Sequence, residues 1–155
     1  MTKQELFLKT IFCCMACDGD IAQEEIDTLK NFAIHMPIFD GLNIEESINS
    51  YISSINQNGV SFLHRYLKEL SEEILTQDDE LQIVDLAIKM IEADNRIEYS
   101  EIKFFKKIRV RLSLSDEQIL AHYPNKEDFL LPDINEIEDL VWDDNVMFTN
   151  IHLNK

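Results

Sequence analysis

The chain contains few residues that interrupt helices. Glycine and proline number three each among 155 residues, so few positions impose a turn or remove a backbone donor. Sustained alternation of apolar and polar residues, the pattern typical of strands, is almost absent before residue 120. The apolar residues recur instead at spacings of three and four, as on one face of a helix. The sequence therefore predicts an all-α fold.

Long apolar runs are also missing. No segment approaches the ~20 consecutive apolar residues of a membrane-spanning helix. The N-terminal stretch MTKQELFLKTIFCCMACDGD starts with polar residues, and Lys9 interrupts its apolar run, which is unlike a signal peptide. We interpret this stretch as a helix of the mature protein. We expect a cytoplasmic protein that is not an integral membrane protein.

Cysteine is scarce, and its positions favour no disulfide. Cys13, Cys14 and Cys17 are an odd number within one predicted helix, which makes a poor disulfide framework. Cys14 and Cys17 form a C-x-x-C pair, which binds zinc or performs redox chemistry in some proteins. A four-cysteine zinc site would need a second pair, and the strand–helix pattern of a thioredoxin is missing. We therefore interpret the three as buried, reduced thiols that pack as small hydrophobes.

Basic residues are few as well. Fourteen Lys and Arg face thirty Asp and Glu, for a net charge of −16. Such a surface repels phosphate backbones and anionic lipid, so we do not expect nucleic-acid binding. It favours cations and basic partners. Solubility alone is the other explanation of this charge, and net charge does not separate the two.

The helical segments add up to a single-domain bundle of about seven helices. We expect helices in the N-terminal stretch, over residues 22–34, 43–55, 60–75 and 76–92, from the second acidic turn to about 112, and briefly after 115. Asn43 with Glu46 and Ser115 with Gln118 resemble capping boxes, and Thr76 with Asp79 is a weaker one. We assign residues 1–122 to this helical domain.

The remaining residues, 123–155, differ in character. Pro124 and Pro132 break helices, and residues 133–144 hold six acids and no bases beside Leu140, Val141 and Trp142. This acidic C-terminal extension either packs on the body or serves as an interaction arm, in which case the partner-binding candidates are Trp142, Asp143 and Asp144. The one basic cluster offers the extension an internal binding site; its members are Lys103, Lys106, Lys107, Arg109 and Arg111.

A short acidic pattern occurs twice, 76 residues apart. The stretch CDGDIAQEEI from Cys17 to Ile26 matches ADNRIEYSEI from Ala93 to Ile102, and apolar positions upstream and downstream also coincide. The repeated unit is a helix, an acidic turn and a second helix. Duplication of such a unit favours pseudo-twofold packing within one bundle.

Neither copy is a calcium-binding EF-hand loop. That loop needs oxygen ligands at positions 1, 3, 5, 7, 9 and 12 and glycine at position 6. Counted from Asp18, position 5 is Ala22 and position 12 is Leu29; counted from Asp94, position 3 is Arg96 and position 12 is Phe105. Both copies fail this test, so we exclude an EF-hand.

Two pairs of carboxylates remain, Asp18 with Glu25 and Asp94 with Glu101. One interpretation is local: Asp-Gly and Asp-Asn are turn dipeptides, and each glutamate falls near position N3 of the next helix, where a carboxylate is favourable. The other is a metal site. Each glutamate heads an apolar stripe, and four carboxylates brought together by twofold packing would repel one another unless protons or a cation neutralise them. Oxygen ligands favour Ca²⁺, Mg²⁺ or Mn²⁺.

These motifs resemble the TerB-like family of bacterial tellurite-resistance proteins. The resemblance lies in Ala16-Cys17-Asp18-Gly19 with Glu25-Ile26, in Ala93-Asp94-Asn95 with Glu101-Ile102, and in the continuation from Phe105 to Ser115, and it covers roughly residues 1–122. It implies an all-helical bundle with an internal duplication, a non-catalytic role in tellurite resistance or related stress systems, and protein partners that are often membrane-associated. It also implies divalent metal at Asp18, Glu25, Asp94 and Glu101. Asn95 and Arg96 depart from the family pattern, and Arg96 offers a cation of its own in the second copy.

Two function classes follow from these features. The first is a TerB-like, stress-associated protein that binds a divalent cation through its acidic turns. The second is a metal-free interaction scaffold that uses its acidic surface or its C-terminal extension. We do not expect an enzyme, because the sequence has no Gly-rich phosphate loop, nucleophile motif or His-rich metal motif.

Overall fold

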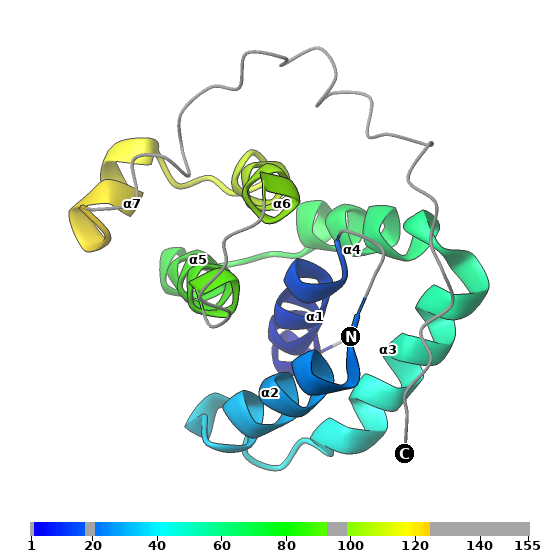
Figure 1. Ribbon diagram of the computed structural model, residues 1–155. Helices are drawn as coiled ribbons and strands as arrows, with labels where there is room; N and C mark the ends of the chain where they lie inside the picture. The colour runs from blue at the N-terminus through cyan, green and yellow to red at the C-terminus, as the bar shows by residue number, and fades with distance from the viewer. Residues whose placement is uncertain (1, 18–20, 93–98, 125–155) are drawn as a thin grey trace.

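The computed structural model describes residues 2–17, 21–92 and 99–124, and within these it confirms the all-α prediction. Seven α-helices and one short 3₁₀ helix form a bundle (Figure 1), and no strand occurs in the described ranges. The elements are α1 (Lys3–Ala16), α2 (Gln23–Ile34), η1 (Pro37–Phe39), α3 (Ile44–Asn58), α4 (Val60–Glu72), α5 (Gln77–Glu92), α6 (Tyr99–Arg109) and α7 (Asp116–His122). The division at residue 122 stays a prediction, because the extension from residue 125 lies outside these ranges.

Helix α1 is the centre of the bundle. It packs against α2, α3, α4, α5 and α6, and Figure 1 shows it enclosed by these helices. Nine of its 14 residues are buried, which matches its nearly uninterrupted apolar sequence. A helix that is apolar on all sides is stable only where neighbouring helices bury all of its sides. The N-terminal stretch is thus a helix, as its sequence predicts, and the structure places this helix in the core of the domain.

The predicted helix starts are confirmed at three positions. The Asn43 side chain accepts a hydrogen bond from the Glu46 backbone amide at 3.1 Å. Thr76 and Asp79 exchange reciprocal side-chain-to-backbone bonds of 3.0 and 3.1 Å, and Ser115 forms a capping box with Gln118. Such caps satisfy amides that have no partner within the helix.

Three helix ends differ from the expected boundaries. Helix α4 ends at Glu72 rather than near residue 75, because Glu73 adopts an extended backbone with ψ of 139°. Helix α6 ends at Arg109, and the amides of Arg111 and Leu112 then bond to carbonyls three residues back, as in tight turns. Helix α3 runs on to Asn58, and Gly59 then takes φ of 57° to reverse the chain into α4, a conformation that glycine adopts without a steric penalty.

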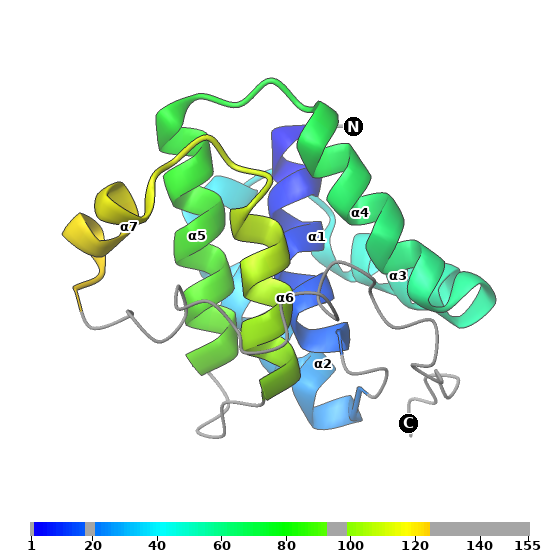
Figure 2. The same ribbon diagram turned by 90° about the horizontal axis from the view of Figure 1, so that it is seen from above.

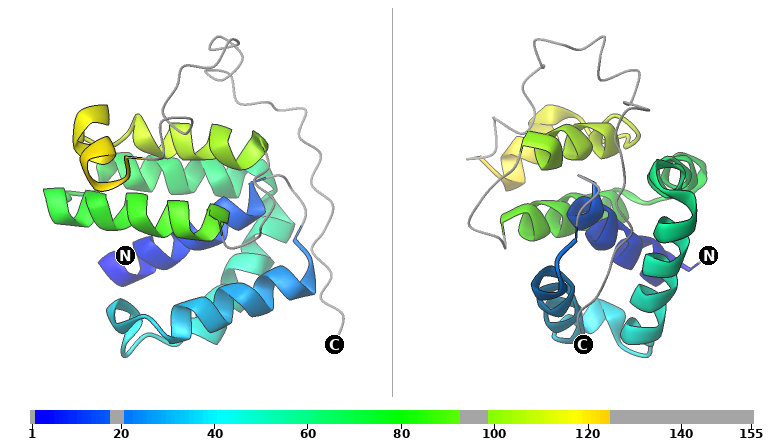
Figure 3. Two further views of the ribbon diagram at one scale, coloured as in Figure 1. Left: turned by 60° about the vertical axis from the view of Figure 1, so that its left-hand side comes forward. Right: turned by 45° about the vertical axis from the view of Figure 1, so that its right-hand side comes forward.

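Helices α1 and α5 lie side by side and run in the same direction (Figures 2 and 3). At their first turns Lys3 Nζ contacts Asp79 Oδ2 at 2.5 Å. Their last residues, Ala16 and Glu92, and the first residues of the helices that follow, Gln23 and Tyr99, are each 76 residues apart. These boundaries agree with the repeat offset. The duplication of the fold itself stays a prediction.

Candidate functional site

The predicted acidic-turn site is described only in part. Asp18 and Asp94 lie outside the described residues, as do Trp142, Asp143 and Asp144. Glu25 and Glu101 are described, and each occupies the third position of its helix, α2 and α6 respectively. A carboxylate at this position faces the positive end of the helix dipole. The positions of both glutamates therefore agree with the local interpretation, in which each carboxylate lies at N3 of its helix.

Both glutamates head apolar stripes, as the spacing predicts. On α2, Leu29 is fully buried and Phe32 packs partly buried against the core, as does Met36 just after the helix. On α6 and its extension, Phe105, Ile108 and Leu112 are all buried. Glu25 and Glu101 themselves are half-buried. Each carboxylate thus sits at the boundary between core and solvent, where it keeps part of its hydration.

The parallel arrangement of α1 and α5 brings the two units to one end of the bundle. Both helices end there, and both α2 and α6 start there (Figure 3). Helix α6, which carries Glu101, also packs against α1. Burial, followed by the charges of Cys13 and Glu101, raises the pKa of Cys14 on α1. The end of the bundle that carries Glu25 and Glu101 is therefore shared by both copies of the motif. We call it the acidic-turn end.

An amide oxygen at this end has no hydrogen bond. Gln23 is the first residue of α2, and its side-chain nitrogen donates to Asp27 Oδ1 at 2.9 Å. Its other terminal atom, Oε1, is buried and accepts no hydrogen bond from any described group. Buried acceptors are almost always paired with a donor or a cation. A neutral amide oxygen is one of the ligand types that Ca²⁺, Mg²⁺ and Mn²⁺ accept.

The three cysteines are buried and form no disulfide among the described residues. Burial raises the pKa of the Cys13 and Cys14 thiols well above the ordinary value, so these side chains stay protonated and are poor nucleophiles and poor metal ligands. The interpretation of them as packed thiols agrees with these surroundings. Among residues 2–17, 21–92 and 99–124, no group of three or more His, Cys, Asp or Glu side chains is placed to hold a metal ion.

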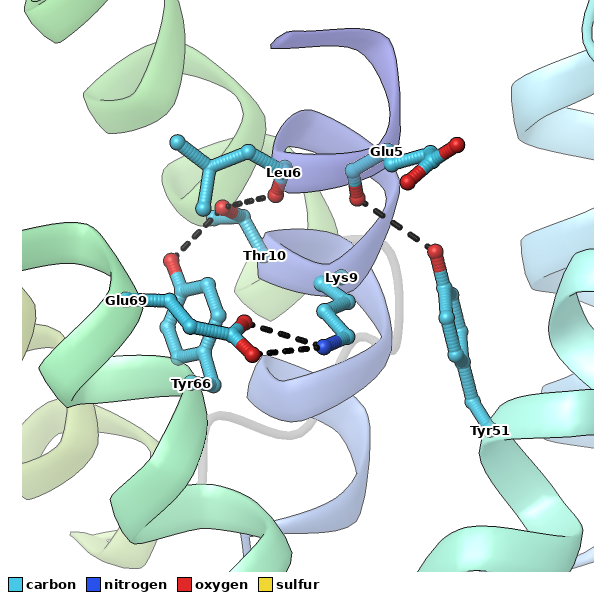
Figure 4. A network of polar contacts seen from close by, with 7 residues as sticks. All are labelled: Glu5, Leu6, Lys9, Thr10, Tyr51, Tyr66 and Glu69. Atoms are coloured by element: carbon cyan, nitrogen blue, oxygen red, sulfur yellow. Dashed lines mark hydrogen bonds and ion pairs between the residues drawn. The ribbon is translucent and has the colours of Figure 1, made fainter. Parts of the chain in front are cut away.

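A buried polar network that no sequence motif indicates lies between α1, α3 and α4 (Figure 4). The Thr10 hydroxyl donates to the Leu6 carbonyl at 2.9 Å and lies 2.6 Å from the Tyr66 hydroxyl. Thr10 and Tyr66 are completely buried, and burial raises the pKa of Tyr66. A phenol of this kind stays neutral and pairs α1 with α4. Thr10 stands out in the sequence as a polar residue within an apolar helix.

An ion pair borders the same network. Lys9 Nζ lies 2.9 Å from Glu69 Oε2, and 5.8 and 5.5 Å from the ring centroids of Tyr51 and Phe62. The ammonium group is thus held by one carboxylate and two aromatic faces. In the sequence, Lys9 is recognisable as unusual because it interrupts the apolar run. Because the charges are already paired, this cluster explains packing of α1 rather than chemistry on a substrate.

A buried carboxylate fixes the connection after α6. Glu80 of α5 is 6% exposed, and its two oxygens accept from the Ser113 backbone amide at 2.6 and 3.1 Å. Tyr123 donates to Asp85 of the same helix at 2.5 Å. These contacts hold the α6–α7 connection and the residue after α7 against α5.

No protein-family model, curated protein or solved structure shows a significant match to this chain. The resemblance to TerB-like proteins accordingly stays a prediction based on the two motifs. No helix in the described part of the chain is long and apolar enough to cross a membrane.

Proposed function

We propose that this protein is a non-enzymatic, TerB-like binding module whose acidic turns bind one divalent cation at the acidic-turn end. The observation that carries the proposal is the parallel packing of α1 and α5, which places Glu25 and Glu101 at the same end of the bundle. Two motifs at opposite ends would be unable to share an ion. In the sequence Asp18 lies between α1 and α2, and Asp94 lies between α5 and α6; the two complete the proposed ligand set.

The chemistry of the described donors supports a hard cation. Glu25 and Glu101 supply carboxylates, and Gln23 supplies a buried amide oxygen without a hydrogen bond. Oxygen donors of these kinds bind Ca²⁺, Mg²⁺ and Mn²⁺. A cation at this end also offsets the mutual repulsion of the carboxylates in a chain of net charge −16.

The biological role follows from the resemblance alone. It supports a role in tellurite resistance or a related stress response, with protein partners that are often membrane-associated. The cytoplasm is proposed from the N-terminal sequence, which is unlike a signal peptide. The acidic surface is compatible with a basic partner.

Thermal unfolding of chelator-treated protein tests the metal site. Ca²⁺, Mg²⁺ or Mn²⁺ at about 100 times its dissociation constant should stabilise the fold by about 2.7 kcal/mol. The double variant Asp18→Asn/Asp94→Asn should lose this metal-dependent gain. The matched control Asp78→Asn/Glu117→Gln removes two exposed acids near the other end of the bundle and should keep it.

Failure of all three ions to raise the unfolding temperature of the wild-type chain would eliminate the metal site. The same holds for an equal rise in the double variant, because binding would then occur elsewhere. Gln23→Leu refines the result: it should weaken the metal effect if Oε1 is a ligand, and leave it unchanged otherwise.

The second candidate function is a metal-free interaction scaffold. The observation in its favour is that Glu25 and Glu101 both occupy position N3, where the helix dipole alone accounts for them. Under this proposal Trp142, Asp143 and Asp144 contact the partner. A chain carrying Trp142→Ala/Asp143→Asn/Asp144→Asn should then lose an identified partner in a binding titration, and unchanged affinity would assign binding to the body of the protein instead.

A further inference from the structure

Positive charge is concentrated on one side of this acidic protein. Helices α4 and α6 lie side by side, and their outer surface carries a group of basic residues that we call the basic face. Helices α2, α3, α5 and α7, in contrast, hold two lysines, Lys30 and Lys89, against many acids. The basic face consists of Lys103, Lys106, Lys107 and Arg111 on α6 and the residues after it, together with Lys68 on α4. Lys68 Nζ lies 4.0 Å from Glu72 Oε1 in an exposed pair of the same helix, which solvent screens.

Packing in the core fixes the basic face. The Tyr66 and Phe104 rings stack with their centroids 6.1 Å apart, which joins α4 to α6. Phe104, Phe105 and Ile108 are buried on the inner side of α6. The helical period then directs Lys103, Lys106 and Lys107 away from that side. Arg111 closes the end of α6 by donating to the Lys107 carbonyl at 2.7 Å.

The basic face also contains an exposed apolar residue. Val110 is 65% exposed, and it follows Lys106 by four residues and Lys107 by three, so the three share one helical surface. A surface that combines ammonium groups, their aliphatic stems and an exposed valine suits a partner that is both acidic and apolar.

We propose that the basic face docks residues 133–144 of the same chain. This segment holds six acids and no bases, together with Leu140, Val141 and Trp142. It therefore offers both of the properties that the basic face complements. Charge complementarity of this kind selects the partner and its orientation.

The segment can reach the basic face from the point where the described chain ends. Pro124 follows α7, which is tied to α6 by the pair of Arg109 and Asp116 at 2.5 Å. Residue 133 is nine positions beyond Pro124, a span of up to about 30 Å when extended. Helix α6 is about 16 Å long. Because the tether is short, the segment is at millimolar effective concentration, ~1 mM, and weak contacts suffice for docking.

When the acidic segment is docked, the segment and the basic face cover each other. While they are in contact, neither Trp142 nor the lysines of α6 is available to another molecule. This inference does not depend on the proposed metal site, which lies at the end of the bundle and not on its α4–α6 side. A strongly acidic or basic competitor would release the segment.

Trp142 is the only tryptophan of the chain, so its fluorescence reports directly on the segment. We would measure quenching by acrylamide, a neutral quencher, in the full chain. The variant Lys68→Glu/Lys106→Glu should weaken docking by about tenfold or more, which raises the quenching constant and moves the emission to longer wavelength. High salt should do the same to the wild type, because the Debye length falls to ~3 Å at ~1 M.

The matched control is Lys30→Glu/Lys89→Glu, which makes the same change of charge on α2 and α5 and should leave the quenching unchanged. Helical circular dichroism confirms that each variant is folded. Adding Asp139→Lys/Asp143→Lys to Lys68→Glu/Lys106→Glu should restore protection of Trp142.

Two results would overturn the proposal. Equal quenching in the wild type and in Lys68→Glu/Lys106→Glu would show that the basic face does not hold the segment. Quenching that changes with protein concentration would show that the segment contacts a second copy rather than its own chain.

Discussion

The helix pair α1–α2 and the helix pair α5–α6 share a sequence pattern but occupy different surroundings. Helix α1 is enclosed by five helices, whereas α5 packs mainly against α1 and α6 and keeps an exposed side. Helix α2 has no base in its last turn, while α6 has Lys106, Lys107 and Arg109 there. The two pairs therefore share their helix boundaries and a glutamate at N3, yet they differ in their surroundings. The first pair includes the central helix α1, and the second includes the basic surface of α6.

Equivalent positions show how the two pairs differ. Thr10 and Lys9 of α1 are 76 residues from Leu86 and Asp85 of α5. Thr10 belongs to the buried network and Leu86 to the apolar core; Lys9 pairs with Glu69, and Asp85 with Lys89 and Tyr123. Lys3 and Asp79, also 76 apart, contact each other. At equivalent positions the two helices thus carry different side chains, and each charged side chain is paired with a group in its own surroundings.

The largest effect should come from the centre of the bundle. Phe12 of α1 is fully buried and contacts the Tyr51 and Phe62 rings, with centroids 5.5 and 5.6 Å away. Phe12→Ala should lower the free energy of unfolding by about 3–5 kcal/mol, and the equivalent Ile88→Val by about 0.5–1.5 kcal/mol. Urea denaturation measures both. A loss at Phe12 well below about 3 kcal/mol would contradict the placement of α1 at the packed centre of the bundle.

An intermediate effect should come from the polar network around α1. Thr10→Val keeps the shape of the side chain but leaves the buried Tyr66 hydroxyl without a partner, which should cost about 1–3 kcal/mol. Thr10→Val/Tyr66→Phe removes both partners and should cost less than the single change. Chemical denaturation of the four chains of this cycle gives the coupling. Simple additivity would mean that the two hydroxyls do not interact.

The smallest effect should come from the contact between the two pairs. The hydrogen bond from Lys3, followed by the Thr76 backbone, lowers the pKa of Asp79 below its ordinary value of 3.8. The stability gained is therefore present above that value and is lost as the pH falls through the lower pKa of the folded state. At pH 7, Asp79→Asn should cost about 0.2–1 kcal/mol.

Urea titrations near neutral pH and below about pH 3 test this dependence. The difference between the wild type and Asp79→Asn should shrink at the lower pH. The neighbouring exposed Asp78→Asn serves as control and should show a smaller difference at pH 7. A cost for Asp79→Asn that is the same at both pH values would exclude the charged contact as its source.

Most of the fold was predictable from the sequence. The seven helices, the caps at Asn43, Thr76 and Ser115, and the apolar stripes below Glu25 and Glu101 all follow from spacing and capping residues. The buried carboxylate of Glu80 was not predicted. It lies in an acidic first turn, and its partner is a backbone amide 33 residues away, which no local pattern indicates.

The residues of the candidate site were predictable from the sequence, but their location in the bundle was not. Spacing alone assigns Glu25 and Glu101 to position N3, but it does not say whether the two units lie at the same end of the bundle. That depends on the direction of α1 relative to α5, which the packing of whole helix faces decides. The unpaired Oε1 of Gln23 likewise becomes visible only once the surrounding side chains are placed.

The sequence by itself determined the helices, their starts and their buried faces, because periodicity and capping act between residues three or four apart. Only the tertiary structure decided which helix is central, that both acidic motifs share one end, and that the bases of α6 lie beside α4. These features join residues that are far apart in the chain, and they depend on how complete helix surfaces fit together.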